Sequence, residues 1–209
     1  MQRILSTLII SLESKKQMIN HKHKFIFIHI PKTGGQSVWE FFYGNNWIRV
    51  NNIKPGSTHH LNCTEKLLNE YFVWTTVRNP YSRTVSLFKY LKKIGQISRK
   101  LSFNHFINYL NLDLLNLDHA HEKHPLGQID FIESLIGSIE NLDFVGRLEN
   151  IQQDFNNVCA KIGIPRKKLP HENKTKHRHY TEYYNEETRQ IVAKKYAKDI
   201  EYFGYKFGE

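Results

Sequence analysis

A lysine and two glycines follow directly on an apolar run near the N-terminus, in the stretch FIFIHIPKTGGQS (25–37). The run stops at Pro31, and Lys32 precedes the pair Gly34 and Gly35. Glycine lets a backbone approach a ligand closely and adopt dihedral angles that other residues avoid. The amides of a helix N-terminus, with the positive end of its dipole, bind phosphate or sulfate. The loop therefore predicts a site for an oxyanion.

The side chains around these glycines extend the prediction. Lys32 adds a positive charge, Thr33 and Ser37 add hydroxyl donors, and a capping box from Ser37 to Glu40 is expected to start a helix. The loop that binds nucleoside triphosphates, GxxxxGK[ST], has its lysine after the glycines, whereas here the lysine precedes them. This order argues against a kinase or a GTPase. A strand-to-helix turn that needs glycine for steric reasons alone stays open as an alternative.

Three apolar runs predict the strands that position this loop, and they span 24–30, 71–77 and 142–147. Helical patterns follow them from Ser37, after Pro80 and from Leu148. Strands alternating with helices predict an α/β fold with a mainly parallel sheet flanked by helices. Ligands bind such sheets beyond the carboxyl ends of the strands, where the glycine loop is expected to lie.

The rest of the chain is expected to complete one domain over 1–209, with 1–23 as an N-terminal extension or an extra helix. Residues 101–117 carry a helical pattern with no strand before it, which predicts an inserted helical cap. Asn185 is expected to cap one C-terminal helix that packs on the sheet. Four residues share its apolar face: Val192, Tyr196, Ile200 and Phe203.

The charge favours an anionic partner, because the chain has 30 Lys and Arg and only 20 Asp and Glu, which gives a net charge of +10. Cys63 and Cys159 have no CxxC spacing, so neither a zinc site nor a disulfide framework is indicated. The apolar run at 4–12 is too short to span a bilayer and has no cleavage pattern after it. A soluble or cytoplasmic protein without a membrane span is expected.

A second motif stands where the strand at 71–77 runs into VRNPYSRTVSLF (77–88). Arg78 follows the strand, Pro80 opens a helix and Ser86 lies on that helix. Together with the glycine loop, this motif resembles the sulfotransferases that use 3′-phosphoadenosine 5′-phosphosulfate (PAPS), specifically the carbohydrate O-sulfotransferase branch, sulfotransferase family 2. The likeness continues through 142–165 and 169–207 and is weakest between about 95 and 140. It implies a P-loop-like fold.

The resemblance also implies roles for single residues. Lys32 would act on the bridging oxygen as the nucleotide leaves, and Arg78 and Ser86 would hold the 3′-phosphate. The residues that would wrap the 5′-phosphate are Thr33, Gly34, Gly35, Gln36 and Ser37. The alternatives are a surface salt bridge for Arg78, worth little energetically, and a neutral helix position for Ser86.

Transfer to a hydroxyl needs a base, and histidine is the usual one near neutral pH. His60 in STHHLNCTEKLL (57–68) best matches the family's catalytic position, with His59 as the neighbour that could replace it. An exposed histidine pair is the alternative. No metal is expected, because lysine, amide dipoles and a base already supply the chemistry. An exposed loop is favoured over a zinc site for DHAHEKH (118–124), which contains His119, His121, Glu122 and His124.

Other residues carry weaker expectations. Lys174 or Lys176 could add a phosphate contact or be solvated, and Arg147 and Glu149 are expected to form a structural ion pair. The expected acceptor is a hydroxyl, on a glycan in the carbohydrate branch, and nucleic acid is not the expected partner. An atypical nucleotide kinase and a basic nucleic-acid-binding module are the alternative functions. The acceptor's identity and the oligomeric state stay open.

Overall fold

The structure is a computed structural model that describes residues 17–44, 65–117, 123–170 and 178–209. Four strands in these segments form one sheet in the order β1-β2-β3-β4. They are β1 (Gln17–Asn20), β2 (Phe25–Ile28), β3 (Phe72–Val77) and β4 (Phe144–Arg147). β2, β3 and β4 are parallel, and β1 is an antiparallel edge strand on β2. The predicted α/β fold with a mainly parallel sheet is confirmed.

The segment 1–23 differs in part from the expected extension or extra helix, because its residues 17–20 form β1. The strands predicted from apolar runs are all present. Their register aligns Ile28 with Thr75 and Val77 with Arg147, so the carboxyl ends of β2, β3 and β4 lie at one edge of the sheet. Every residue of β2 is buried, as expected for a strand that is covered on both faces.

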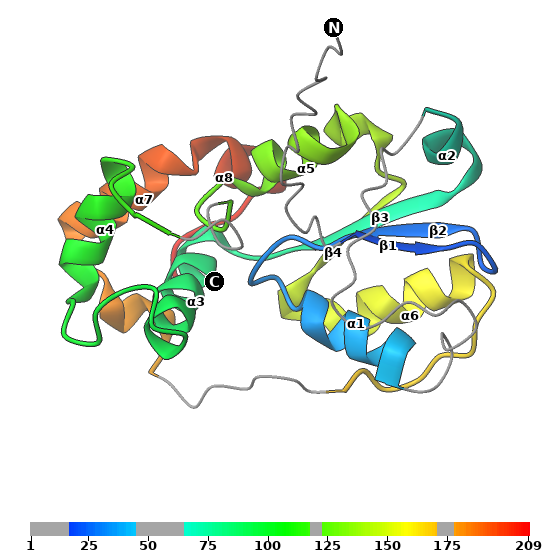
Figure 1. The fold of residues 1–209 in the computed structure, drawn as a ribbon, viewed down its shortest axis with the longest axis horizontal. Helices are drawn as coiled ribbons and strands as arrows, with labels where there is room; N and C mark the ends of the chain where they lie inside the picture. The colour runs from blue at the N-terminus through cyan, green and yellow to red at the C-terminus, as the bar shows by residue number, and fades with distance from the viewer. Residues whose placement is uncertain (1–16, 45–64, 118–122, 171–177) are drawn as a thin grey trace, which may run out of the picture.

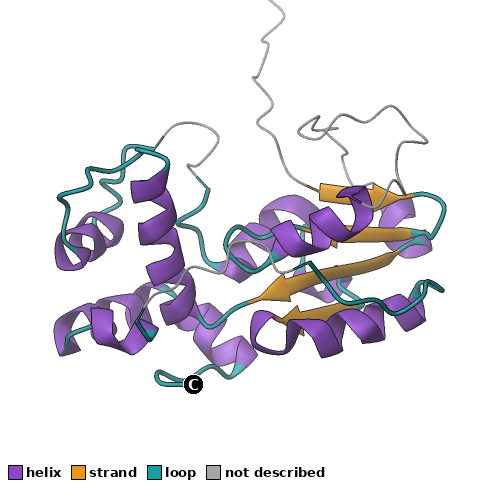
Figure 2. Ribbon diagram, turned by 90° about the horizontal axis from the view of Figure 1, so that it is seen from below, coloured by secondary structure: helices purple, strands orange, loops and turns teal. Residues whose placement is uncertain are grey.

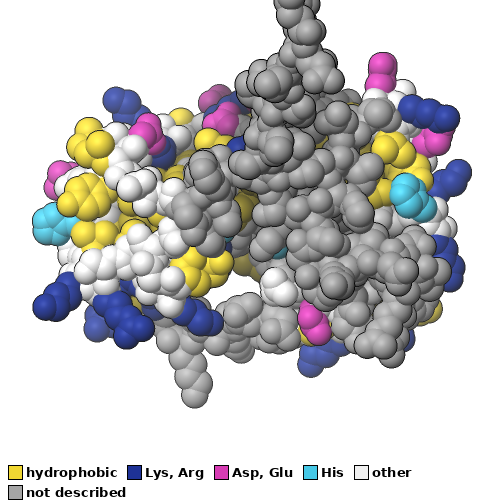
Figure 3. All heavy atoms as spheres, in the orientation of Figure 1, with side chains coloured by type: hydrophobic (Ala, Val, Ile, Leu, Met, Phe, Trp, Pro, Cys, Tyr) yellow, Lys and Arg dark blue, Asp and Glu magenta, His cyan; other side chains and the backbone are white. Residues whose placement is uncertain are grey.

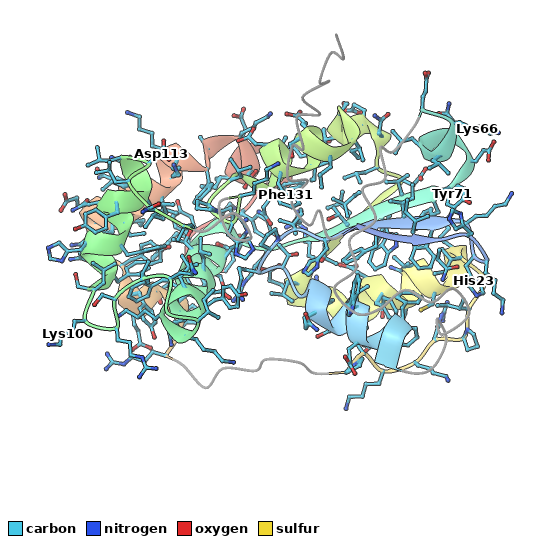
Figure 4. All side chains as sticks on the ribbon, viewed as in Figure 1. His23, Lys66, Tyr71, Lys100, Asp113 and Phe131 are labelled. Carbon is cyan, nitrogen blue, oxygen red and sulfur yellow. The ribbon has the colours of Figure 1, made fainter. Side chains whose placement is uncertain are left out.

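Helices cover both faces of the sheet (Figures 1 and 2). α1 (Gly35–Gly44) and α6 (Ile151–Lys161) enclose a core around Phe27, Trp74 and Phe155. On the opposite face, α5 (Gln128–Ile136) and α8 (Ala197–Phe203) enclose a second core, to which Phe131, labelled in Figure 4, belongs. The short α2 (Glu65–Glu70) packs against this second core through Leu67 and Leu68. α5 lies in the region that the sequence analysis left without an assignment.

Three further helices form a cluster beside the carboxyl ends of the strands (Figures 1 and 2). They are α3 (Pro80–Lys93), α4 (Phe103–Asn111) and α7 (Glu186–Lys195), and they pack around Phe88, Phe106 and Val192. The helix expected over 101–117 is shorter and ends at Asn111. Single turns of 3-10 helix span Ile139–Asn141, Leu148–Asn150 and Tyr180–Tyr183.

The C-terminal region corrects one expectation. Asn185 caps a helix as predicted, with its Oδ1 accepting the backbone N–H of Thr188 at 2.8 Å. That helix, α7, ends before Tyr196, and α8 follows as a separate helix. The Tyr196 hydroxyl donates to the carbonyl of Pro125 at 2.8 Å. The break lets α7 pack in the helical cluster while Phe203 of α8 packs on the sheet, which one continuous helix would not do.

Candidate functional site

The glycine loop connects the carboxyl end of β2 to α1, as predicted. Its Thr33 is fully buried and turned into the protein: Oγ1 donates to the carbonyl of Ile30 at 2.9 Å and lies 3.3 Å from the hydroxyl of Thr76. The hydroxyl of Thr33 is therefore committed to the core, contrary to the expectation that it faces a ligand. Only the backbone amide of Thr33 is left for an oxyanion.

Close packing explains both glycines of the loop. At Gly34 a Cβ atom would lie 2.6 Å from Cδ1 of Leu148, and the backbone φ of +89° is one that other residues avoid. At Gly35 a Cβ atom would overlap the ring of His29. The steric explanation left open by the sequence therefore holds at both positions. It does not exclude an oxyanion site, because Leu148 and His29 occupy the positions of the missing side chains and not the backbone amides.

Lys32 is the strained residue of the loop, with a left-handed φ of +71°. Such a conformation is uncommon outside glycine, asparagine and aspartate, and it is often held at functional sites by the surrounding structure. The Lys32 ammonium lies 3.9 Å from the centroid of the Tyr90 ring on α3. This cation–π contact directs the Lys32 side chain along α3.

The start of α1 corrects the predicted capping box. The helix begins at Gly35, two residues before Ser37, and the backbone N–H of Ser37 donates to the carbonyl of Gly34 at 3.0 Å. Ser37 is therefore inside the first turn and does not cap it. Gln36 is exposed in that turn. The first amides of a helix have no acceptor within the helix, so this end of α1 keeps the donor character that an anion needs.

Arg78 lies at the carboxyl end of β3 and contacts the glycine loop directly. Its Nη1 donates to the carbonyl of Lys32 at 3.3 Å, while Nε and Nη2 donate to Oγ of Ser82 at 3.0 and 2.8 Å. Burial lowers the pKa of Arg78 to about 10, and the nearby Glu149 carboxylate partly opposes that shift. The guanidinium remains charged at neutral pH. Its hydrogen bonds go to neutral oxygens, so Arg78 is not the surface salt bridge considered as the alternative.

One face of α3 connects these groups. The helix begins with Pro80 after Asn79, whose side chain accepts the N–H of Tyr81 at 3.1 Å. Ser82, Ser86 and Tyr90 follow at four-residue spacing, so they share a face of the helix. Ser82 binds Arg78 and Tyr90 binds Lys32, which places Ser86 one turn from each contact. The structure thus brings Lys32, Arg78 and Ser86 to one region.

Arg83 holds the loop from the buried side of α3. Its Nε donates to the carbonyl of Pro31 at 3.0 Å, and its two terminal nitrogens donate to the carbonyls of Leu126 and His124 at 2.8 and 3.0 Å. The residue is almost completely buried, and burial lowers its pKa. Arg83 therefore ties the start of the glycine loop to the segment that precedes α5.

Arg147 and Glu149 contact different groups and not each other, contrary to the expected ion pair. Glu149 accepts the backbone N–H of Asn79 at 2.8 Å through Oε1 and the hydroxyl of Tyr205 at 3.2 Å through Oε2. Arg147 donates to the carbonyl of Phe203 and lies 4.8 Å from the ring centroid of Tyr205. Glu149 thus fixes the backbone directly after Arg78.

Several predicted residues lie outside the described segments: His59, His60, Lys174, Lys176 and most of DHAHEKH. His124, the last residue of that stretch, is described, and its backbone carbonyl binds Arg83. In the segments that the structure describes, no three His, Cys, Asp or Glu side chains are grouped as a metal site would require.

Three residues that shape the site were not predicted from the sequence: Ser82, Arg83 and Gln128. Ser82 follows Arg78 by four residues, and this helical spacing could have identified it. Gln128 binds the backbone of Arg78 from α5, 50 positions away, and belongs to no motif. No local signal in the sequence could have identified Gln128.

Comparison with known proteins decides the family. The model of the Sulfotransferase family matches residues 15–206, nearly the whole chain. The chain belongs to this family. Carbohydrate sulfotransferase 9 of Homo sapiens is 26% identical over 225 aligned positions, which cover 87% of this chain and 47% of that relative. The chain thus spans about half the length of this sulfotransferase.

Two other proteins are similar to this sulfotransferase-family chain. An uncharacterized protein of Archaeoglobus fulgidus is 32% identical over 103 residues, covering 48% of this chain and 75% of the relative. The crystal structure of a sulfotransferase from Alicyclobacillus acidocaldarius has a TM-score of 0.40 and 16% identity, covering 64% of this chain and 53% of that one. Within the described segments, no helix has the length and apolar character needed to cross a bilayer.

Proposed function

We propose that this protein transfers the sulfuryl group of PAPS to a hydroxyl of a carbohydrate acceptor. The observation that carries the proposal is the contact between the two motifs. Arg78 after β3 donates to the carbonyl of Lys32 after β2, at 3.3 Å. Neighbouring parallel strands therefore bring Arg78 and the glycine loop to one edge of the sheet, where ligands of α/β proteins bind.

The residues of the site suit a donor that carries anionic groups at two positions. The start of α1 offers the backbone amides of Gly35 and Gln36 and the side chains of Gln36 and Ser37 as donors for the 5′-phosphate. Arg78 and Ser86 are the proposed ligands of the 3′-phosphate. Ser82, which lies between them in the sequence, accepts hydrogen bonds from the Arg78 guanidinium and so fixes its position. Arginine suits this task because its planar fork of donors matches phosphate oxygens.

The proposed reaction is a direct in-line displacement. The acceptor hydroxyl oxygen forms a bond to sulfur as the bond between sulfur and the bridging phosphate oxygen breaks. The hydroxyl proton passes to a base, for which we propose His60, and the leaving bisphosphate takes the negative charge. Lys32 stabilises that charge through its ammonium. No covalent intermediate with the protein is formed.

The similarity to carbohydrate sulfotransferase 9 across 87% of the chain supports a carbohydrate as the acceptor. A transfer assay with labelled PAPS tests the acceptor class across glycans, lipids and small phenols. We expect label to enter glycans. Transfer to phenols alone would contradict the carbohydrate proposal while leaving sulfuryl transfer intact.

The donor is tested by binding. Adenosine 3′,5′-bisphosphate, the product of the reaction, is titrated against ATP and against an oligonucleotide. We expect preference for the bisphosphate, and Arg78→Ala is expected to remove the preference over adenosine 5′-phosphate. Tighter binding of ATP would favour the kinase alternative, and tighter binding of the oligonucleotide with a steep salt dependence would favour a nucleic-acid-binding module.

The base is tested by two neighbouring variants. His60→Ala is expected to keep affinity for the bisphosphate and to lose transfer, because the residue acts on the acceptor proton only. His59→Ala is the matched control and is expected to keep both. Loss of transfer in His59→Ala alone would assign the base to His59.

A further inference from the structure

The side chain of Gln128 forms hydrogen bonds with both the backbone N–H and the backbone carbonyl of Arg78. Its Oε1 accepts the N–H of Arg78 at 2.8 Å and its Nε2 donates to the Arg78 carbonyl at 2.9 Å. Arg78 follows β3 directly, and Val77 is the last residue of β3 that pairs with β4. Gln128 thus continues the hydrogen bonding of the strand by one residue. It is completely buried, so water does not replace these bonds.

Asp199 of α8 in turn fixes Gln128. Its Oδ2 accepts the N–H of Gln128 at 2.7 Å and its Oδ1 accepts the N–H of Ile129 at 2.9 Å. These are the first amides of α5, whose own preceding residue, Gly127, supplies no side-chain cap. Asp199 therefore caps α5 from another helix, and it is 1% exposed. The two residues form a chain of contacts from α8 to Arg78.

The chain of contacts reaches the backbone of Arg78, whereas Ser82 and the Lys32 carbonyl hold its guanidinium. The backbone contact fixes the position of the Arg78 main chain, and the side-chain contacts fix the position of its guanidinium. A hydrogen bond weakens steeply as its length and angle depart from the preferred geometry, so a small displacement of the guanidinium lowers its affinity for a phosphate. Gln128 is therefore placed to control how well Arg78 meets a phosphate.

We propose that Gln128, oriented by Asp199, is a positioning residue that sets the selectivity of the site for the 3′-phosphate of the donor. The inference rests on the proposed function, in which Arg78 binds that phosphate. Neither Gln128 nor Asp199 touches the donor in this role. They act through the backbone of Arg78 alone.

The test measures the ratio of two dissociation constants, for adenosine 3′,5′-bisphosphate and for adenosine 5′-phosphate, by calorimetry on the full chain. Gln128→Met keeps an unbranched side chain of similar size and removes both hydrogen bonds to Arg78. We expect the preference for the bisphosphate to fall by roughly 10-fold or more, the factor that corresponds to losing one hydrogen bond to a charged group. Affinity for the monophosphate should change less than about twofold, since the glycine loop binds the 5′-phosphate. Asp199→Asn is expected to lower the preference in the same direction by a smaller factor.

Asp143→Ala is the matched control, because it removes the carboxylate that accepts the N–H of Val73 at 2.7 Å near the opposite end of β3. It is expected to lower the melting temperature and to leave the preference unchanged. Equal preference in Gln128→Met and in the wild type would overturn the inference and make Gln128 purely structural. If Gln128→Met does not fold, Asp199→Asn decides instead, because it keeps Gln128 and removes one of the two oxygens that accept the amides of Gln128 and Ile129, and an unchanged preference in that variant would overturn the inference. A wild type without preference would refute the proposed function and the inference with it.

Discussion

Lys32 combines a charged side chain with a left-handed backbone. In the proposed chemistry the charge acts on the leaving oxygen, and the backbone conformation has no direct part. Lys32→Ala is expected to lower turnover by about 100-fold or more, because it removes the charge that is proposed to stabilise the leaving oxygen. The measurement is labelled transfer from PAPS, with circular dichroism to verify the fold.

Lys24 provides the control for this substitution. It also has a positive φ, +47°, and it precedes β2 at the end opposite to Lys32. Lys24→Ala should therefore show any effect of removing a lysine from a strained backbone without losing the charge at the site. A similar loss of turnover in both variants would contradict the catalytic role of Lys32.

Arg78 leads to a prediction about pH. Because burial lowers its pKa to about 10, its positive charge is lost at a lower pH than for an ordinary arginine. Preference for the bisphosphate over the monophosphate should be constant between about pH 7 and about pH 9 and should decline as the pH rises through about 10. Bound phosphate favours the charged form and shifts this decline upward. Titration calorimetry in a pH series measures this preference. A decline centred near neutral pH would show that a group other than Arg78 controls it.

At the scale of elements, the junction of β2 and α1 depends on the absence of a side chain at Gly35. Gly35→Ala would place a Cβ atom in the ring of His29 and is expected to destabilise the fold by roughly 1–3 kcal/mol. Chemical denaturation measures the change. Adding His29→Ala should relieve the clash, so the double variant should lose less than the sum of the single losses. Additive losses would show that the clash is not the cause.

The start of α7 depends on its cap. Asn185→Ala removes the oxygen that accepts the Thr188 N–H and is expected to cost about 1 kcal/mol of unfolding free energy. Asn104→Ala is the matched control, because Asn104 is exposed within α4 and alanine favours helix there. Thermal melts of both variants test the difference. Equal stability of the two variants would contradict the capping role.

Elements that follow from local pattern could be predicted from the sequence, and elements that depend on distant partners could not. The buried runs of β2 and β3 and the cap at Asn185 are local features, and they are present as expected. The sequence around Tyr196 has no glycine or proline to mark the break between α7 and α8, and the Tyr196 hydroxyl bonds to Pro125, 71 positions away. The side chain of Thr33 turns inward because the Ile30 carbonyl accepts its hydroxyl, a choice that the residue type alone does not fix.

The candidate site also contains parts that could be predicted from the sequence and parts that could not. The glycine loop and the motif after β3 could be found because each is contiguous in the sequence. The contacts that hold them together come from Gln128, Arg83 and Glu149, whose partners lie 41 to 70 positions away. Contiguous motifs predict the candidate ligand residues, and only the folded arrangement identifies the residues that hold them in place.

At the scale of the whole molecule, the net charge of +10 should assist the capture of anionic nucleotides. Figure 3 shows Lys and Arg side chains gathered at the edge where Figure 4 labels Lys100, beyond the end of α3. Raising the salt from about 0.05 M to about 0.5 M should slow association of the bisphosphate markedly, because exposed charges are screened. Stopped-flow binding measures the rate, with uncharged adenosine as the control. A salt-independent rate would restrict the effect of charge to contacts inside the site.

The contacts around Arg78 connect segments from the whole length of the chain. Asn79, next to it, donates through Nδ2 to the carbonyl of Lys206 at 2.8 Å, 127 positions further on, and Asp199 caps α5 from the last helix. A chain emerging from the ribosome therefore has its glycine loop and its arginine long before it has the groups that align them. We therefore expect binding of the proposed nucleotide to require residues 199–206, so that it would report the docking of these late segments onto Arg78 and its neighbours.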